Sequence, residues 1–338
     1  MASKNLNPNI TILDVAREAN VSYSTVSRVL SGFEFVKEST KQRVLEAVDH
    51  LGYVVNPQAR SLAGGKSRVI GLLVPALDNG YINEIVRGID AELNKLDYDL
   101  LLYTTHRDNG KEASYAVKLT KGLADGLLLI VPLLDNTYTE TLQAQSFPYV
   151  LVDQGAPNSF IVDCTNWQGA YDATQYLIQL GHKRIGFITG LMALISAQDR
   201  LDGYRTALLD NGIKFDPDLV HVGNYTHSGA EQPTHQLLDL PVPPTAIFAA
   251  NDLSAFGTLE AVRARGLRIP EDISIMGFDD IPQCLLAYPQ LTTIHQPLEQ
   301  MGHMAARMLV EQIENPELPP RHITLATKLV IRNSCQAL

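Results

Sequence analysis

Residues 21–30 are VSYSTVSRVL, and the spacing of their apolar side chains predicts a short helix with two different faces. One face can pack on a small core through Val26, Val29 and Leu30. The opposite face carries hydroxyl groups, an aromatic ring and a guanidinium, on Tyr23, Ser24, Ser27 and Arg28. These groups can reach base edges in a DNA major groove. An ordinary surface helix would have the same pattern, so the flanking sequence has to distinguish the two possibilities.

The residues before this stretch predict a first helix and a tight turn. Thr11 can cap a helix that begins at Ile12, with Asp14 placing negative charge in its first turn. Asn20 tolerates the left-handed conformation of a tight turn, and Ser22 can cap the next helix through its hydroxyl. Two short helices joined in this way form a helix-turn-helix, whose second helix docks in the major groove.

A third helix is predicted to begin at Ser39, because residues 39–42, Ser-Thr-Lys-Gln, have the form of a capping box. Gly52 would end it. The apolar residues expected on its inner side are Val44, Ala47, Val48 and Leu51. Three helices of this length bury little area, which suits a module that gains order from DNA and from a second copy.

Residues 56–67, NPQARSLAGGKS, are either a flexible linker or a hinge. Pro57 and the pair Gly64-Gly65 frame a helix that is too short to be stable alone in water. A linker is the simpler interpretation. The alternative is a helix that forms only on DNA, with Leu62 inserted at a minor-groove base step and Arg60 near phosphate.

Charge is unevenly distributed along the 338 residues, whose net charge is −10. Residues 1–68 carry nine Lys or Arg against six Asp or Glu, whereas the rest of the chain carries 18 against 31. An acidic body repels phosphate, so contact with nucleic acid is expected only in the N-terminal part.

Composition and cysteine usage limit the class of protein. Hydrophobic residues make up 45% of the chain and charged residues 19%, as in globular proteins. No apolar run approaches the roughly 18–20 residues of a membrane span, and the polar N-terminus does not resemble a signal peptide. The cysteines are few and widely separated, as in a reducing compartment: Cys164, Cys284 and Cys335.

From Arg68 onward, short apolar runs alternate with helical periods. Buried parallel strands are predicted at 69–74, 100–103, 127–131, 150–152, 185–188, 246–249 and 273–277. Helices are predicted at 81–96 and 111–123. This rhythm indicates two doubly wound α/β units.

Polar and aromatic residues follow these strands, where open parallel sheets bind their ligands. The candidate ligand-binding residues are Asn79, Tyr81, Thr105, Asn166, Trp167, Arg200, Asn251, Asp252, Asp279 and Gln296. Carboxylates and amides can pair with vicinal hydroxyls, and Tyr81 or Trp167 could cover the apolar face of a sugar. Asn and Asp also cap helices, Asp252 above all, and Trp167 could instead be core packing or stack on a purine.

The chain resembles the lactose-repressor and galactose-repressor (LacI/GalR) family. The similar segments are TILDVAREANVSYSTVSRVLSG, residues 11–32, and ESTKQRVLEAVDHLGYVVNPQARSLAGGKS, residues 38–67, and the similarity continues to residue 334. The resemblance implies a helix-turn-helix headpiece at 1–55, a hinge at 56–67 and a periplasmic-binding-protein-like body at 68–338. The implied body has one subdomain at about 68–166 and 297–322, and a second at about 167–296 and 323–338.

The resemblance also implies roles for single residues. Tyr23 resembles the family's base-reading tyrosine and Arg28 its recognition arginine, whereas Ser24 departs from the glutamine of some members. The implied DNA contacts are Thr11, Ser22, Tyr23, Ser24, Thr25, Ser27, Arg28, Asn56, Arg60 and Leu62. Motifs around Arg200, Asn251 and Asp279 match the family's effector pocket, whereas the loops at 75–82 and 165–167 depart from it, so the ligand itself is not implied.

We therefore expect a ligand-responsive, sequence-specific transcriptional regulator, a homodimeric repressor of carbohydrate-utilisation genes with a sugar effector and palindromic double-stranded operator DNA. A regulator that responds to purines or other metabolites is one alternative, and a solute-binding protein without DNA binding is another. Motifs such as His-Glu-x-x-His and Gly-x-Ser-x-Gly are missing, so no enzyme activity, cofactor or metal is expected. The expected location is the bacterial cytoplasm, at the nucleoid, with no membrane partner.

Overall fold

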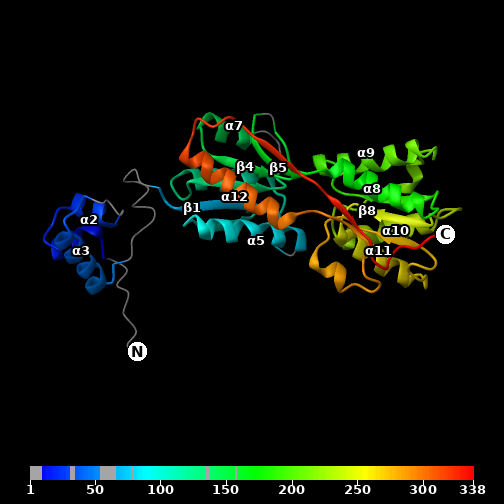
Figure 1. The fold of residues 1–338 in the computed structure, drawn as a ribbon, viewed down its shortest axis with the longest axis horizontal. Helices are drawn as coiled ribbons and strands as arrows, with labels where there is room; N and C mark the ends of the chain where they lie inside the picture. Colours follow the sequence, from blue (N-terminus) through cyan, green and yellow to red (C-terminus); the bar gives the residue numbers. More distant parts are fainter. Residues whose placement is uncertain (1–9, 31–34, 54–65, 78, 134–136, 157) are drawn as a thin grey trace, which may run out of the picture. The chain divides into compact units, whose positions relative to one another are not determined.

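The computed structural model describes residues 10–30, 35–53, 66–77, 79–133, 137–156 and 158–338 (Figure 1). The chain divides into two compact units, Met1–Ser67 and Arg68–Leu338. The predicted hinge helix, with Asn56, Arg60 and Leu62, lies outside the described residues.

The first unit contains the predicted helix-turn-helix. Helix α1 spans Ile12–Glu18 and α2 spans Tyr23–Leu30. The Thr11 N–H donates to Asp14 Oδ2 over 2.9 Å, and the Thr25 N–H donates to Ser22 Oγ over 3.2 Å, so both predicted helix starts are confirmed. Asn20, between the helices, has a φ of 53°, as the tight turn requires.

Helix α3 spans Glu38–Leu51, and its predicted start at Ser39 is wrong. The carbonyl of Lys37 accepts the N–H groups of Thr40 and Lys41, so Lys37 is the residue that precedes the helix and Ser39 lies inside its first turn. Gly52 ends the helix with a φ of 64°, as predicted. Val15, Val26 and Val44, one from each helix, are fully buried at the centre of the small core.

The body contains two parallel sheets. The first has the strand order β11-β5-β4-β3-β1-β2. Its strands are β1 (Val69–Val74), β2 (Asp99–Thr104), β3 (Gly126–Ile130), β4 (Tyr149–Val152), β5 (Phe160–Cys164) and β11 (His322–Leu325). The helices of this lobe are α5 (Gly80–Lys95), α6 (Asn109–Thr120), α7 (Thr137–Ala144) and α12 (Leu298–Glu314).

The second sheet has the strand order β7-β6-β8-β9. Its strands are β6 (Ile185–Thr189), β7 (Val220–Val222), β8 (Ala246–Ala249) and β9 (Ser274–Met276). The helices of this lobe are α8 (Asn166–Gln179), α9 (Ile195–Asp210), α10 (Glu231–Leu238) and α11 (Asp252–Ala264), with short 3-10 turns η1 (Pro217–Leu219), η2 (Ser228–Ala230) and η3 (Pro282–Leu285). The strands predicted from sequence are confirmed in both lobes, within a few residues at their ends.

Within the described residues, the chain passes between the lobes at three places: from β5 to α8, from β10 (Thr293–His295) to α12, and from β11 to β12 (Lys328–Val330). Strand β11 pairs with β5 through Leu325, so residues 323–325 lie in the first sheet and not, as predicted, in the second subdomain. In Figure 1 the C-terminal segment, in red, runs from the first lobe into the second. Thr165 and Thr327 lie on two of these crossings, and their hydroxyl oxygens form a hydrogen bond of 2.9 Å.

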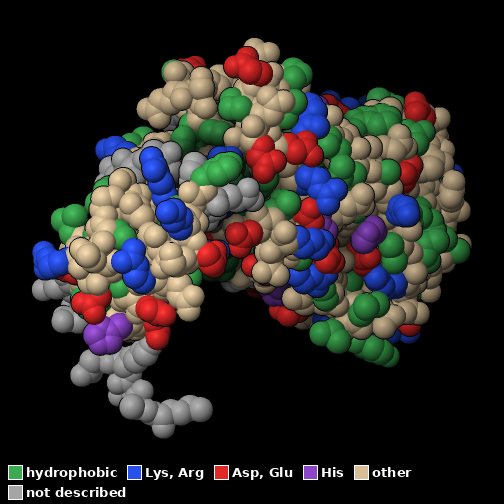
Figure 2. Space-filling model, turned by 60° about the vertical axis from the view of Figure 1, so that its left-hand side comes forward, with side chains coloured by type: hydrophobic (Ala, Val, Ile, Leu, Met, Phe, Trp, Pro, Cys, Tyr) green, Lys and Arg blue, Asp and Glu red, His purple; other side chains and the backbone are tan. Residues whose placement is uncertain are grey.

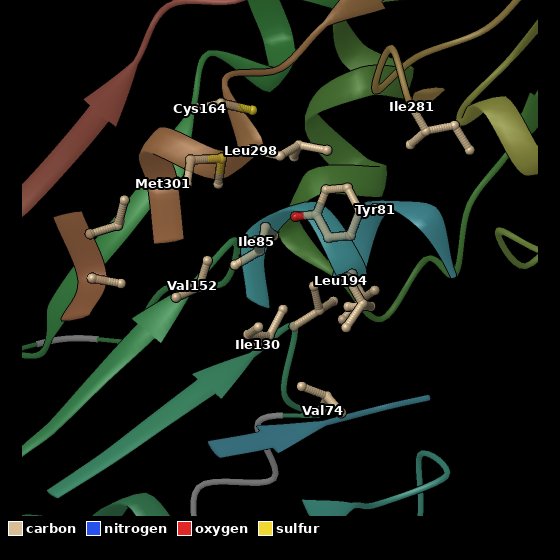
Figure 3. Packing of buried hydrophobic residues seen from close by; sticks show 14 of the residues in the cluster. Val74, Tyr81, Ile85, Ile130, Val152, Cys164, Leu194, Ile281, Leu298 and Met301 are labelled. Carbon is tan, nitrogen blue, oxygen red and sulfur yellow. The ribbon is translucent and has the colours of Figure 1, made fainter. Parts of the chain in front are cut away.

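Helices α5 and α12 pack very closely in the first lobe. A Cβ atom added to Gly88 would lie 2.0 Å from the Glu299 carbonyl oxygen, and one added to Gly302 would lie 2.1 Å from that of Ile85. Figure 3 shows Ile85 and Met301, from these two helices, beside Val152 at the end of β4. The two glycines therefore let the backbones of α5 and α12 approach each other closely.

The surface is mixed in charge. Lys and Arg side chains, in blue, are interspersed with Asp and Glu side chains, in red, over the face presented in Figure 2. None of the helices in the described part of the chain is both long and apolar enough for a membrane span.

Candidate functional site

The outer face of α2 carries the side chains that the sequence assigns to DNA. Tyr23 is 44% exposed, and Ser24 and Arg28 are exposed beside it. Ser22 Oγ lies 2.9 Å from Ser24 Oγ and 2.8 Å from Thr25 Oγ1. The hydroxyls of Ser22, Ser24 and Thr25 are thus held together at the N-terminal end of α2. This is the end that contacts base edges in helix-turn-helix proteins.

Two further predicted DNA contacts, Ser27 and Thr11, also lie among the described residues. Ser27 is half-buried on α2, one residue from Arg28. Thr11 is exposed at the start of α1. The outer face of α2 therefore presents polar groups along the helix, and the role of each group in contacting DNA is still a prediction.

A cavity lies in the body at the carboxyl ends of the strands of both sheets. The space open to the centre of a water-sized molecule is about 40 Å³. The residues that line it come from both lobes: Pro75, Asn79, Tyr81, Ile82, Arg107, Val131, Asp153, Ser196, Arg200, Tyr225, Asn251 and Asp279. The general position agrees with the rule for open parallel sheets.

Several lining residues have a left-handed backbone. The φ angle is 55° at Arg107, 47° at Val131, 55° at Asp153, 62° at Tyr225 and 121° at Asp279. For residues other than glycine such angles cost roughly 1–2 kcal/mol each. Backbone strain gathered around one cavity is typical of functional sites, where the surrounding fold holds side chains in a required direction.

Arg200 is held in place by several partners in the second lobe. Its Nε donates to Asn166 Oδ1 over 2.9 Å, and its Nη1 donates to the Ala250 carbonyl over 2.5 Å. The guanidinium carbon lies 3.7 Å from the centre of the Phe278 ring, and Nη1 lies 3.6 Å from Asp279 Oδ1. This fully buried arginine presents a fixed positive charge at the cavity wall.

Two buried carboxyl groups face the same space, one from each lobe. Asn166 Nδ2 donates to Asp153 Oδ1 over 3.1 Å, and Gln296 Nε2 donates to Asp279 Oδ1 over 2.6 Å. Burial raises the pKa of both Asp153 and Asp279, because the charged form loses its hydration. Both groups are thus positioned to pair with ligand hydroxyls.

Three buried polar atoms of the lining have no hydrogen-bond partner among the described residues: Tyr81 Oη, Tyr225 Oη and Arg107 Nη1. Burial raises the pKa of Tyr81, and the negative charge of nearby Asp153 raises it further. The two side chains are nevertheless outside hydrogen-bond geometry. A buried polar atom without a partner costs roughly 1–3 kcal/mol. A polar ligand that pairs with these atoms would recover that free energy.

Five of the predicted ligand-binding residues line the cavity: Asn79, Tyr81, Arg200, Asn251 and Asp279. The cap alternative also holds for two of them, since Asn79 Oδ1 accepts from the Tyr81 N–H and Asn251 Oδ1 from the Ser254 N–H. Asn166 and Gln296 lie behind the wall, where they hold Arg200 and the two carboxyl groups.

Three predicted residues are directed away from the cavity, which corrects the sequence-based assignment. The Thr105 hydroxyl contacts the Val74 carbonyl and Glu112. Asp252 accepts hydrogen bonds from the Ile281 N–H, the Thr293 hydroxyl and the Cys284 thiol, so it joins segments of the second lobe. Trp167 is 38% exposed and stacks on Tyr171 at 5.3 Å between ring centres.

Sequence reasoning missed Arg107, Asp153, Ser196 and Tyr225. Asp153 directly follows β4 and Arg107 follows β2 by three residues, so the rule on strand ends could have found both. Tyr225 follows β7, which has only three residues and was not predicted.

The two units match two known protein-family models. Residues 11–56 match bacterial regulatory proteins of the lacI family, and residues 174–335 match the periplasmic binding protein-like domain. The HTH-type transcriptional repressor PurR of Aliivibrio salmonicida is 34% identical over 331 residues, which cover 97% of this chain and 99% of the relative. The chain belongs to the lacI family of bacterial regulatory proteins.

Solved structures agree with this lacI-family assignment. The lac repressor dimer bound to operator and the anti-inducer ONPF has a TM-score of 0.85 and 28% identity, over 97% of this chain and 99% of the other. The complex of the transcriptional regulator CelR with cellobiose has a TM-score of 0.75 and 32% identity, over 96% and 100%. The predicted fold class, a helix-turn-helix headpiece joined to a periplasmic-binding-protein-like body, is confirmed.

Proposed function

We propose that this lacI-family regulator is a homodimeric repressor whose binding to operator DNA is controlled by a small hydroxylated ligand held between the two lobes of the body. One observation carries this proposal: the cavity combines Asn79 and Tyr81 of the first lobe with Arg200, Asn251 and Asp279 of the second. A ligand that contacts both sides stabilises one angle between the lobes over others.

The three crossings between the lobes provide a route from ligand to DNA. A change of lobe angle alters the separation of the two segments that lead to the headpieces of a dimer, and therefore how the recognition helices fit two half-sites. The coupling is reciprocal, so a ligand that weakens DNA binding is itself bound less tightly by the DNA complex.

Two observations support a homodimer on a palindromic operator. The similar lac repressor structure is a dimer bound to operator. In this chain, Leu285, Leu286 and Tyr288 form an apolar group at η3 that is 55%, 84% and 87% exposed. Exposed apolar groups of this kind are typical of protein interfaces.

A sugar is the favoured ligand class. The lining combines carboxyl, amide and guanidinium groups, which pair with hydroxyls, and the similar CelR structure holds cellobiose. A purine regulator is the alternative, because PurR is a relative. The ring predicted to stack on a purine, Trp167, does not line the cavity, which favours the sugar.

The other parts of the proposal follow from the family. The cavity binds its ligand without catalysis, as in a repressor, and the protein acts in the cytoplasm on chromosomal DNA. A transport-type solute-binding protein would not need the helix-turn-helix unit, so we set that alternative aside.

The test begins with the full-length wild-type protein and a duplex selected from a random DNA library. Sugars, sugar acids, sugar phosphates and nucleobases are then screened for a rise in the unfolding temperature and for an effect on binding to that duplex. Asp279→Asn should reduce the response to the active compound, whereas Asp202→Asn, at a carboxyl on α9 whose side chain is 63% exposed, should not. Failure to select any preferred duplex would refute the function.

A further inference from the structure

The cavity lining contains an arginine, Arg107, that forms no ion pair with a carboxylate of the described residues. Arg107 follows β2 in a turn where His106 and Arg107 both have left-handed φ angles, 54° and 55°. Its Nη1 is buried at the cavity wall without a hydrogen-bond partner, and within the described ranges no ion pair joins Arg107 to a carboxylate. The strained turn therefore directs the Arg107 guanidinium into the cavity and leaves its Nη1 without a hydrogen-bond partner among the described residues.

Arg200, the other arginine of the lining, differs in this respect. Its guanidinium donates to Asn166 and Ala250 and lies 3.6 Å from Asp279. It belongs to a hydrogen-bonded wall that exists before any ligand binds. Arg107, from the opposite lobe, is the arginine with bonding capacity left for a ligand.

The carboxyl groups at and beside the cavity accept hydrogen bonds from groups other than Arg107. Glu112, whose negative charge raises the pKa of Arg107, accepts from the Thr105 hydroxyl over 3.2 Å and from the Leu133 N–H over 3.3 Å. Asp153 and Asp279 accept from Asn166 and Gln296. Burial lowers the pKa of Arg107, the sign expected for a cation that loses hydration without gaining a close counter-ion.

A buried charge without a partner is costly, and a guanidinium pairs most strongly with a carboxylate or a phosphate, through two parallel hydrogen bonds. We infer that the ligand of this cavity is an anionic sugar derivative whose acidic group pairs with Arg107, while its hydroxyls contact Asn251 and Asp279 across the cleft. The inference rests on the proposed function and names the ligand class. An ion pair to one lobe and hydroxyl contacts to the other would also make lobe closure depend on the acidic group.

The test compares matched pairs of compounds on the full-length protein at constant ionic strength. The pairs are D-glucose with D-glucuronate, D-galactose with D-galacturonate, D-glucose with D-glucose 6-phosphate, and D-ribose with D-ribose 5-phosphate. We expect at least one acid to raise the unfolding temperature where its neutral partner does not. Whether the acid is a sugar acid or a sugar phosphate distinguishes a carboxylate from a phosphate.

Variants then test whether Arg107 binds the acidic group. Arg107→Gln should weaken the affinity for that acid roughly 10- to 100-fold, the loss typical of a charge-assisted hydrogen bond. Arg205→Gln is the matched control, because Arg205 lies on the far side of α9 from the cavity lining, with 47% of its side chain exposed. That control should bind the acid as the wild type does.

The inference is overturned if neutral sugars or nucleobases stabilise the wild type and the acids do not, if no anion of the panel binds, or if Arg107→Gln keeps full affinity for the acid. The first comparison uses only the wild type, so it does not depend on the folding of a variant. The proposed function is judged separately, by selection of a preferred duplex and by a ligand effect on it. A neutral sugar that released the protein from the duplex would support the proposed function and contradict the inference that the ligand is anionic.

Discussion

Gln296 Nε2 donates to Asp279 Oδ1 over 2.6 Å, and this bond links a lobe crossing to the cavity. Gln296 lies directly after β10, where the chain returns to the first lobe, and its side-chain oxygen Oε1 also accepts from the Cys164 thiol over 2.8 Å. Asp279 lines the cavity. A ligand that changes the position of the Asp279 carboxyl therefore acts directly on a segment that joins the lobes.

Replacement of Gln296 by alanine should weaken ligand binding without any direct contact to the ligand. The Asp279 carboxyl would lose a donor and gain freedom to rotate, and loss of a hydrogen bond to a charged group costs about 1.5–3 kcal/mol. Titration calorimetry with the active ligand measures the change. Gln300→Ala, an exposed glutamine four residues later, is the control, and equal affinities for the two variants would contradict the positioning role.

Arg28→Ala should lower affinity for the selected duplex by roughly 1–3 kcal/mol and relax the preference at one base pair. Arg28 is exposed on α2 beside Tyr23 and Ser24, where a guanidinium can reach a guanine edge. Fluorescence anisotropy on the selected duplex and on its single-base variants measures both effects. An equal loss on random DNA would indicate contact with phosphate in place of base reading.

Gly302→Ala should destabilise the body by about 1–3 kcal/mol, the range for overpacking of a close contact. The added Cβ would lie 2.1 Å from the Ile85 carbonyl oxygen, and backbone atoms of α5 cannot move aside without separating the two helices. Urea unfolding measures the change. Gly110→Ala, near the start of α6, has its closest contact at 3.2 Å to a side chain, so its effect should stay within about 1 kcal/mol.

Asp252 should make stability decrease as pH rises from 4 to 6. Burial raises the pKa of this carboxyl from 3.8 to about 6, against the opposing effect of its hydrogen bonds. Between these values the folded chain holds a proton that the unfolded chain has released, so rising pH favours unfolding. The free energy of unfolding of the wild type minus that of Asp252→Asn should therefore fall across this window, and a difference that rises or stays level would contradict the assignment.

The helix-turn-helix could be predicted from local sequence because its signals act over a few residues. The Thr11–Asp14 pair, the left-handed Asn20 and the Ser22 hydroxyl each act on neighbouring backbone, and the structure has all of them in place. Strands β1 to β4, β6, β8 and β9 could be predicted equally well, because continuous apolar runs are required wherever a parallel sheet is covered on both faces. Strands β5, β7, β10 and β11 were not predicted. The predicted start of α3 was wrong because the capping pattern at Ser39 falls inside the first turn, whose N–H groups bond to the Lys37 carbonyl.

By itself, the sequence determined the three helices of the headpiece, the α/β alternation of the body, the division between them, and several of the strand ends at which ligand-facing residues should lie. Tertiary structure alone decided which side chains turn into the cavity. Asp252 is held by Ile281 and Thr293, and Trp167 by Tyr171, whereas the strained turn at Arg107 directs its guanidinium inward. The direction of a side chain at a strand end depends on hydrogen bonds and packing with segments far away in the chain, and local spacing carries no information about those partners.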